Sequence, residues 1–190
     1  FMAIRQHKGK KWILWAGTDI LHLENGYWLD NIGDIRVNPK PFCEYLNKYC
    51  ENWCENVAEQ ERLARLGIKT KVCPSFLGDI NKFKITYKWS ARPQVYCSVS
   101  GDNFIQYGWD VVERIAGKCN VDFHLYGNSK VWKTKYLNLF VHGRVPKEQM
   151  NAEIEQMQCG LRPLEFDGFS EVLAKAVFTG QYPISRIKYP

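Results

Sequence analysis

Long apolar runs are missing from this 190-residue sequence, and none approaches the roughly 20 residues that a membrane-spanning helix needs. The first residues lack the apolar core and cleavage site of a secretory signal. Regular cysteine spacing is missing too, because the seven cysteines form an odd set and Cys50/Cys54 has no second pair for zinc. These absences favour a cytoplasmic protein with reduced thiols and no metal, and they leave peripheral membrane contact open.

The composition is that of a folded globular chain. Hydrophobic residues make up 45% and aromatic residues 14%, enough for one good core or two small ones. The net charge of +6 is scattered, apart from the basic stretch His7-Lys8-Gly9-Lys10-Lys11. Because no stacking motif accompanies the charge, a nucleic-acid-binding role ranks third among the functions considered below.

The first half of the chain alternates apolar segments with turns. Residues 11–16 are predicted to form a buried strand that ends in a loop at residues 17–19. A strand near residues 49–53 precedes a helix over residues 56–66, which Asn56 caps and Gly67 ends. The remaining predictions are a segment over residues 22–42 that is irregular or interrupted by turns, a short strand over 71–73 and a polar linker over 79–93.

The second half repeats strand and helix more regularly, which predicts an α/β fold with a parallel, right-handed sheet. The predicted strands cover residues 95–100, 121–126, 137–141, 159–164 and 182–185. The predicted helices cover residues 109–116, a segment from Pro146, and 169–179, and Val111, Val112, Ile115 and Ala116 are expected on one helical face. His124 falls mid-strand, where a core or hydrogen-bonded histidine is expected, whereas His142 ends a strand. In open parallel sheets, ligands bind at the carboxyl ends of the strands.

One stretch carries a more specific pattern: Leu161-Arg162-Pro163-Leu164-Glu165-Phe166-Asp167-Gly168-Phe169-Ser170, then Ala176-Val177-Phe178-Thr179-Gly180-Gln181-Tyr182-Pro183-Ile184. It resembles the donor-binding signature of the retaining GT-B glycosyltransferases, the glycogen-synthase-like and mannosyl- and rhamnosyltransferase group. The resemblance implies a minimal or truncated member. Its expected fold is a GT-B-like arrangement, with a Rossmann-like nucleotide-sugar domain over residues 91–190 after a partial acceptor-side α/β lobe over residues 1–90.

The resemblance also implies roles for individual residues. The helix start after Gly168 would attract a diphosphate, and Arg144 or Arg162 could bind phosphate oxygens. Asp19 and Asp167 are the catalytic candidates. The predicted donor-binding residues are Gly101, Arg144, Val145, Arg162, Asp167, Gly168, Phe169, Ser170 and Lys175. The donor would be a nucleotide sugar, used without a metal or other cofactor, and the acceptor a glycan, a lipid or a protein.

Three positions depart from the family pattern. Asp102 and Tyr107 stand about where the family carries the Arg and Lys that hold the diphosphate, and Lys175 replaces a Glu. Lys175 fits a phosphate contact and an exposed ion pair with Glu171 equally well. These departures keep a second function open, a non-catalytic GT-B-like module that binds a glycan, a nucleotide or a protein partner.

Overall fold

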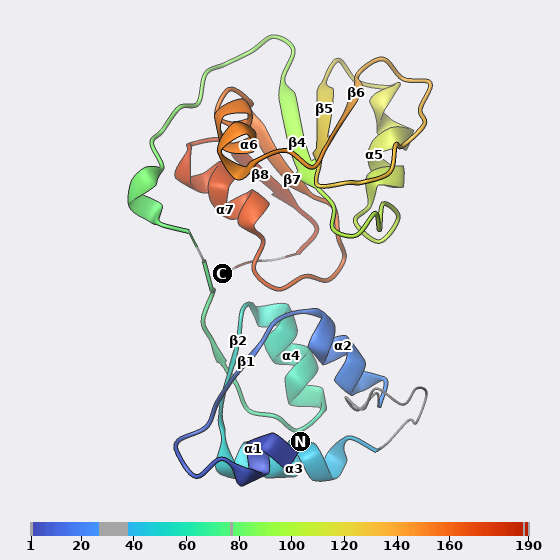
Figure 1. The fold of residues 1–190 in the computed structure, drawn as a ribbon. Coiled ribbons are helices and arrows are strands. Elements are labelled where there is room, and N and C mark those ends of the chain that lie inside the picture. The colour runs from blue at the N-terminus through green and yellow to red at the C-terminus, as the bar shows by residue number, and fades with distance from the viewer. Residues whose placement is uncertain (1, 27–37, 77, 188, 190) are drawn as a thin grey trace. The chain divides into compact units, whose positions relative to one another are not determined.

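The computed structural model describes residues 2–26, 38–76, 78–187 and 189. The turns predicted around Asn31 and Gly33 lie outside the described residues. The chain forms two compact units (Figure 1). Unit 1 comprises Phe1–Ser75, Phe166–Phe169 and Ile187–Pro190, and unit 2 comprises Phe76–Glu165 and Ser170–Arg186. The donor and acceptor roles given to residues 91–190 and 1–90 stay predictions.

Unit 1 contains a three-stranded parallel sheet with the order β1-β2-β3. Its strands are β1 (Trp12–Trp15), β2 (Glu51–Cys54) and β3 (Lys71–Val72). Its helices are α1 (Met2–Gln6), α2 (Thr18–Glu24), α3 (Lys40–Tyr49) and α4 (Val57–Arg65). Side chains from all four helices pack in one apolar cluster with Trp15 and Cys54, so the core of unit 1 lies on one face of the sheet.

The strand and helix around Asn56 are confirmed. Asn56 caps α4, because its side-chain oxygen accepts a 3.0 Å hydrogen bond from the Glu59 amide. Gly67 follows the helix with φ 79°, a left-handed conformation that glycine adopts without steric cost.

Two predictions for unit 1 are wrong. The strand over residues 11–16 is only half buried, because β1 lies at the edge of the sheet and exposes Trp12 and Leu14 on the face away from the core. Residues 22–42 are not simply irregular, since they include the end of α2 and the start of α3. Pro41 lies in the first turn of α3, where its fixed φ favours a helix rather than a break.

Unit 2 contains a five-stranded parallel sheet with the order β6-β5-β4-β7-β8. Its strands are β4 (Gln94–Ser98), β5 (Asp122–Tyr126), β6 (Leu139–Gly143), β7 (Cys159–Arg162) and β8 (Tyr182–Ser185). Its helices are α5 (Trp109–Ala116), α6 (Lys147–Ile154), α7 (Glu171–Phe178) and the short 3₁₀ helix η1 (Ile80–Lys82). The predicted α/β alternation and parallel sheet are confirmed.

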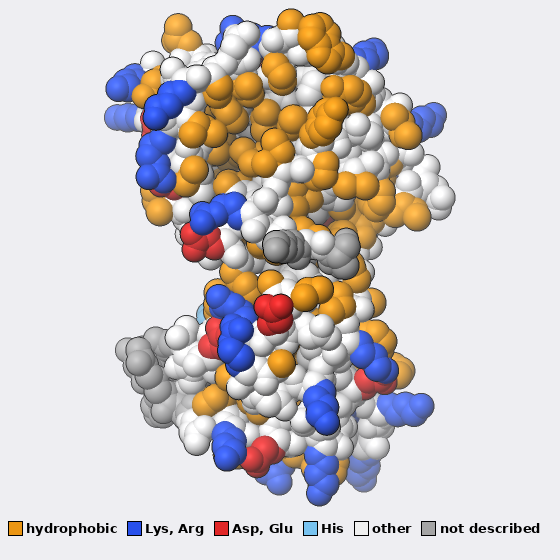
Figure 2. Space-filling view, turned by 180° about the vertical axis from the view of Figure 1, so that it is seen from behind, with side chains coloured by type: hydrophobic (Ala, Val, Ile, Leu, Met, Phe, Trp, Pro, Cys, Tyr) orange, Lys and Arg blue, Asp and Glu red, His pale blue; other side chains and the backbone are white. Residues whose placement is uncertain are grey.

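Two apolar clusters cover opposite faces of this sheet. Trp109, Val112 and Ala116 of α5 pack on one face, and α6 and α7 pack with Tyr96 and Tyr126 on the other. Ile115 does not share the buried face of α5 as predicted, because it is exposed. Hydrophobic side chains also gather on the surface of unit 2 seen in Figure 2.

The order of the strands defines where a ligand would bind in unit 2. The chain runs outward from β4 through β5 to β6, then returns to place β7 on the other side of β4. The carboxyl ends of β4 and β7 therefore flank the point at which the winding reverses, where α/β sheets form their ligand crevice.

Two further features concern the state of the cysteines and the length of the helices. All seven cysteines are free thiols, and burial in β4 raises the pKa of Cys97 strongly. Within the described residues, no helix is both long and apolar enough to cross a membrane.

Candidate functional site

The loop after β4 is built around Asp102. Gly101 and Asp102 both have positive φ, 62° and 58°, which turns the chain sharply at the end of the strand. The Asp102 carboxylate accepts hydrogen bonds from the amides of Ser129 (2.5 Å) and Lys130 (3.0 Å), and these bonds lower its pKa. Asp102 thus ties the loop after β4 to the loop after β5, which gives this departure from the family pattern a structural role.

Tyr107 and Arg162 meet beside the same strand end. The Arg162 guanidinium lies 4.6 Å from the centre of the Tyr107 ring and donates a 3.3 Å hydrogen bond to the carbonyl of Ser98. A side chain at Gly108 would lie 2.9 Å from Pro163, so the loops after β4 and β7 are closely packed. The structure therefore brings Arg162 to the reversal point, held there by an aromatic ring.

Arg144 and Val145 follow β6. Gly143 turns the chain with φ 78°, and its amide donates to the side chain of Asn128 at 3.1 Å. Arg144 is exposed, and its charge helps to lower the pKa of Asp102, so it faces the same group of loops. Val145 is partly buried against the cluster around Tyr126, which makes it a packing residue.

Residues 166–169 belong to unit 1, although the family resemblance implies that they belong to the donor domain. The side-chain amide of Asn56 donates to the carbonyls of Asp167 (2.8 Å) and Gly168 (3.2 Å). The backbone amide of Phe169 donates to the Glu55 carboxylate at 2.7 Å. A side chain at Gly168 would collide with that carboxylate, so glycine here permits the approach of Glu55.

A second carboxyl group, that of Glu59, is hydrogen-bonded to the backbone of Glu55. Its two oxygens accept hydrogen bonds from the amides of Gly17 (2.6 Å) and Glu55 (2.7 Å). The residue is fully buried, and burial raises the pKa of Glu59 to about 7. This carboxyl group can therefore gain or lose a proton near neutral pH. Sequence reasoning missed Glu55 and Glu59, although the spacing of Asn56 and Glu59 is that of a helix cap and its third residue.

Asp19, the other catalytic candidate, lies in the first turn of α2 in unit 1. Its carboxylate accepts hydrogen bonds from the amides of Ala16 (3.1 Å) and Ile20 (2.9 Å). Burial raises the pKa of Asp19 despite these bonds. The geometry gives Asp19 a part in closing the turn between β1 and α2, and its catalytic role stays a prediction.

The other predicted residues on α7 belong to unit 2. Ser170 caps the helix, because its hydroxyl accepts a 3.4 Å hydrogen bond from the Leu173 amide. Lys175 is only 6% exposed, and its ammonium lies 3.8 Å from Glu171. Burial lowers the pKa of Lys175. The predicted ion pair with Glu171 is present, but its lysine is buried rather than exposed, since α7 is buried along Val172 to Ala176 and encloses the lysine stem.

His124 on β5 and His142 on β6 stack against each other. Nδ1 of His124 and Nε2 of His142 are 2.9 Å apart. Burial lowers the pKa of His124 to about 4, and its Nε2 has no hydrogen-bond partner among the described residues. His124 thus has the partly buried, hydrogen-bonded ring expected of a core or satisfied histidine, with Nδ1 paired to His142.

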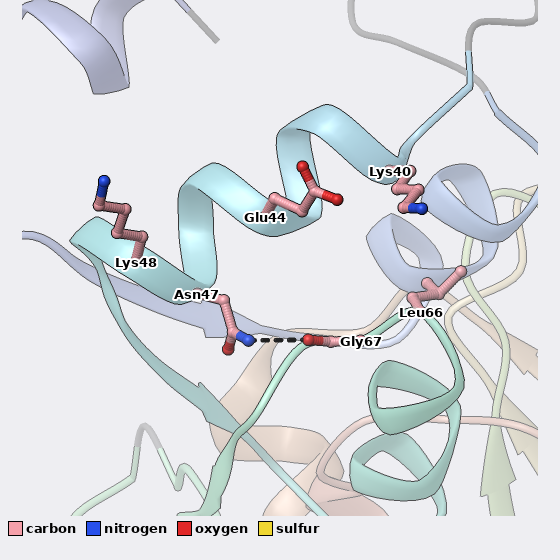
Figure 3. Close-up of a pocket in the computed structure, with 6 residues that line it drawn as sticks. All are labelled: Lys40, Glu44, Asn47, Lys48, Leu66 and Gly67. Carbon is pink, nitrogen blue, oxygen red and sulfur yellow. Dashed lines mark hydrogen bonds between the residues drawn. The ribbon is translucent and has the colours of Figure 1, made fainter.

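A separate pocket of about 380 Å³ lies between α3 and the turn after α4 (Figure 3). The side chain of Asn47 points at Gly67 and donates to its carbonyl at 2.9 Å, while Lys48 points away. None of the predicted site residues lines this pocket. Across the described part of the chain, no group of three or more His, Cys, Asp or Glu side chains is placed to hold a metal ion.

The sheet order of unit 2, preceded by the smaller parallel α/β unit, defines a GT-B-like, glycosyltransferase-like fold. Among the solved structures that share this fold, two match 97% of this chain. One is TarM (TM-score 0.63, 16% identity), and the other is the S. aureus TarM G117R mutant in complex with Fondaparinux, alpha-GlcNAc-glycerol and UDP (TM-score 0.64, 17% identity). This chain spans 38% of the length of each. No protein-family model and no curated protein matches the sequence.

Proposed function

We propose that this chain binds a nucleotide sugar and transfers its glycosyl group to a glycan, lipid or protein acceptor. The observation that carries the proposal is the reversal of strand order between β4 and β7, with Arg162 at the strand end. The likeness to a TarM structure that contains UDP and a GlcNAc-glycerol supports the same ligand class.

The nucleotide would lie against the loops after β4, β6 and β7. Arg162 is already held beside Tyr107, and Arg144 is exposed near Asp102, so both guanidinium groups could reach phosphate oxygens. We propose that these charges and the start of α7 replace a divalent cation. The resemblance of residues 161–184 to the retaining family supports retention of the anomeric configuration.

The test is calorimetric titration of the chain with UDP and with UDP-GlcNAc, with and without EDTA. We expect both ligands to bind, with affinities that EDTA leaves unchanged. Failure of every common nucleotide sugar to bind would refute the proposal, and loss of binding in EDTA would refute metal independence. Release of UDP during incubation with a glycan acceptor, and the anomeric configuration of the product by NMR, would then test transfer.

A second candidate is a GT-B-like module that binds without catalysis. Three groups at positions that the resemblance assigns to donor binding are engaged within the protein, which favours this candidate. Asp102 accepts two loop amides, the Phe169 amide donates to Glu55, and Lys175 is buried beside Glu171. Nucleotide-sugar binding without consumption of the donor, in the presence of acceptors from all three classes, would select this second candidate.

A further inference from the structure

The segment that joins β5 to β6 in unit 2 has side chains that alternate in exposure. Its residues 127–138 are all described and form no helix, and the segment runs past α5 to the start of β6 (Figure 1). Four alternate residues are exposed, namely Val131, Lys133, Lys135 and Leu137, and the residues that follow each of them are half-buried. Side chains of an extended chain alternate between two faces, so the exposed set shares one outer face. We call residues 131–137 the outer strip.

The half-buried side chains hold the strip against α5. The Trp132 ring lies 5.0 Å from the Phe104 ring, and its indole donates a 3.0 Å hydrogen bond to Glu113 on α5. At the other end, the Asn138 amide donates a 2.8 Å hydrogen bond to the carbonyl of Ala116, the last residue of α5. Because both ends are anchored, a partner that binds the strip does not have to order it first.

The outer face combines positive charge with apolar groups. Val131 is 80% exposed and Leu137 is 94% exposed, and the two exposed lysines lie between them. Residues 123–147 contain five lysines and arginines and no acidic residue. The Glu113 carboxylate reaches the segment from the inner side, through the Trp132 indole. A complementary partner therefore has two negative groups flanked by apolar ones.

The backbone of the strip is also available for pairing. Within the described residues, the N–H groups of residues 131–135 have no hydrogen-bond partner, and the first amide that has one is that of Tyr136, bonded to the Thr134 hydroxyl. Exposed backbone groups of this kind form a template for a second extended chain. The partner is thus expected to supply carbonyl groups at strand spacing.

These features decide between kinds of partner. A single-stranded nucleic acid needs rings on which its bases stack, but the Trp132 ring packs inward on Phe104. Insertion into a bilayer would place unpaired peptide groups in a region that cannot bond to them. Pairing with the same strip of a second copy would set lysines opposite lysines, and like charges directly opposite destabilise a strand pair. An acidic peptide meets none of these objections.

We propose that the outer strip binds an extended acidic peptide by strand addition. Acidic side chains at two alternate positions of the peptide lie opposite Lys133 and Lys135, and apolar side chains flank them, opposite Val131 and Leu137. The peptide belongs to a partner protein, and its binding requires neither nucleotide-sugar binding nor transfer.

The experiment is fluorescence anisotropy with a labelled synthetic peptide of sequence Val-Thr-Glu-Thr-Glu-Thr-Val, titrated with the full chain. We expect binding that weakens as salt is added. Lys133→Glu with Lys135→Glu should weaken it by about tenfold or more, because two attractive cross-strand pairs become repulsive. The thermal unfolding temperature should not change, since both side chains are exposed. The peptide with lysine in place of both glutamates should bind this variant and not the parent.

Two controls separate strand addition from general charge attraction. The same peptide, N-methylated at alternate residues along its pairing edge, keeps its charges but cannot donate there, and it should bind at least about tenfold more weakly. Lys84→Glu with Lys88→Glu reverses two exposed lysines elsewhere in unit 2 and should bind the acidic peptide like the parent.

Failure of the acidic peptide to bind the parent would overturn the proposal. Equal binding by the strip variant, or by the N-methylated peptide, would overturn it as well. The chain is also mixed with phosphatidylglycerol vesicles and with a single-stranded oligonucleotide. Binding of either one that depends on Lys133 and Lys135 and exceeds binding of the peptide would assign the strip to that partner instead.

Discussion

Units 1 and 2 are both parallel α/β structures, but they bury polar groups in different ways. Unit 1 buries carboxyl groups, with Glu59 fully enclosed and Glu55 bonded to a loop amide. Unit 2 is held by apolar clusters on both faces of its sheet, and its cations include Arg162 at a strand end and the buried Lys175 on α7. The comparison teaches that the titratable carboxyl group of unit 1 and the cations proposed to bind phosphate in unit 2 belong to separate sets of residues.

The largest expected effect concerns the turns of the two units. Gly127→Ala in unit 2 forces alanine into φ 88° and drives its Cβ into the carbonyl of Val99. The left-handed backbone costs about 1–2 kcal/mol and the overpacking about 1–3 kcal/mol more. The matched change in unit 1, Gly67→Ala, meets no atom within 4 Å and should cost only the backbone term. The free energy of unfolding of both variants can be measured in urea, with hydrogen exchange as the probe. Equal losses of stability in the two variants would contradict the argument.

A second test uses the pH dependence of stability to examine the buried carboxyl group of unit 1. In the folded chain Glu59 keeps its proton up to about pH 7, whereas an unfolded glutamate loses it near 4.5. The folded state therefore binds more protons in this range, and the Glu59 contribution makes stability fall as pH rises, by on the order of 3 kcal/mol.

The measurement for Glu59 is the free energy of unfolding between these two pH values. Glu59→Gln cannot titrate and should flatten the slope relative to the parent. The exposed Glu61→Gln on the same helix serves as the control and should keep it. A parent and a Glu59→Gln variant with the same pH dependence would show that Glu59 does not hold its proton.

A third test addresses the cations at the strand ends of unit 2. Charge-assisted contacts to phosphate are worth about 1.5–3 kcal/mol, so replacing either Arg144 or Arg162 by alanine should weaken UDP binding by about tenfold or more. Arg114→Ala, which removes only an exposed ion pair on α5, should leave the affinity unchanged. If both strand-end variants bind UDP like the parent in calorimetry, the phosphate clamp lies elsewhere.

The smallest expected effect concerns Lys175. Lys175→Met removes a buried charge whose partner Glu171 stays partly hydrated, and it should stabilise the chain by about 1 kcal/mol. Lys175→Glu should lower the unfolding temperature, because it buries a carboxylate four residues from Glu171. If Lys175 contacts the nucleotide, both changes should alter UDP affinity severalfold. Thermal scans and calorimetry check the two effects separately, and destabilisation by methionine would contradict the burial argument.

The sequence predicted the elements of unit 2 well, because each strand is a short apolar run closed by a glycine or a polar turn. It predicted α3 poorly, since Pro39 and Pro41 suggest turns although Pro41 also suits a helix start. The bonds from Asn56 and Glu55 to residues 166–169 join positions more than 110 apart in the chain. Local periodicity carries no information about such pairs, so the polar contacts of the candidate site could not be predicted.

Unit 1 is discontinuous in the chain, and this has a consequence for its biosynthesis. The Glu55 carboxylate is made early, but the Phe169 amide that it accepts leaves the ribosome more than a hundred residues later. Until then Oε2 of Glu55 and Nδ2 of Asn56 must bond to water or to temporary partners, whereas Oε1 of Glu55 and Oδ1 of Asn56 already have Ser75 and Glu59. Synthesis of unit 1 thus begins first, and its last segments follow only after most of unit 2 has been translated. For the same reason, no single cut of the gene yields both units with all their segments.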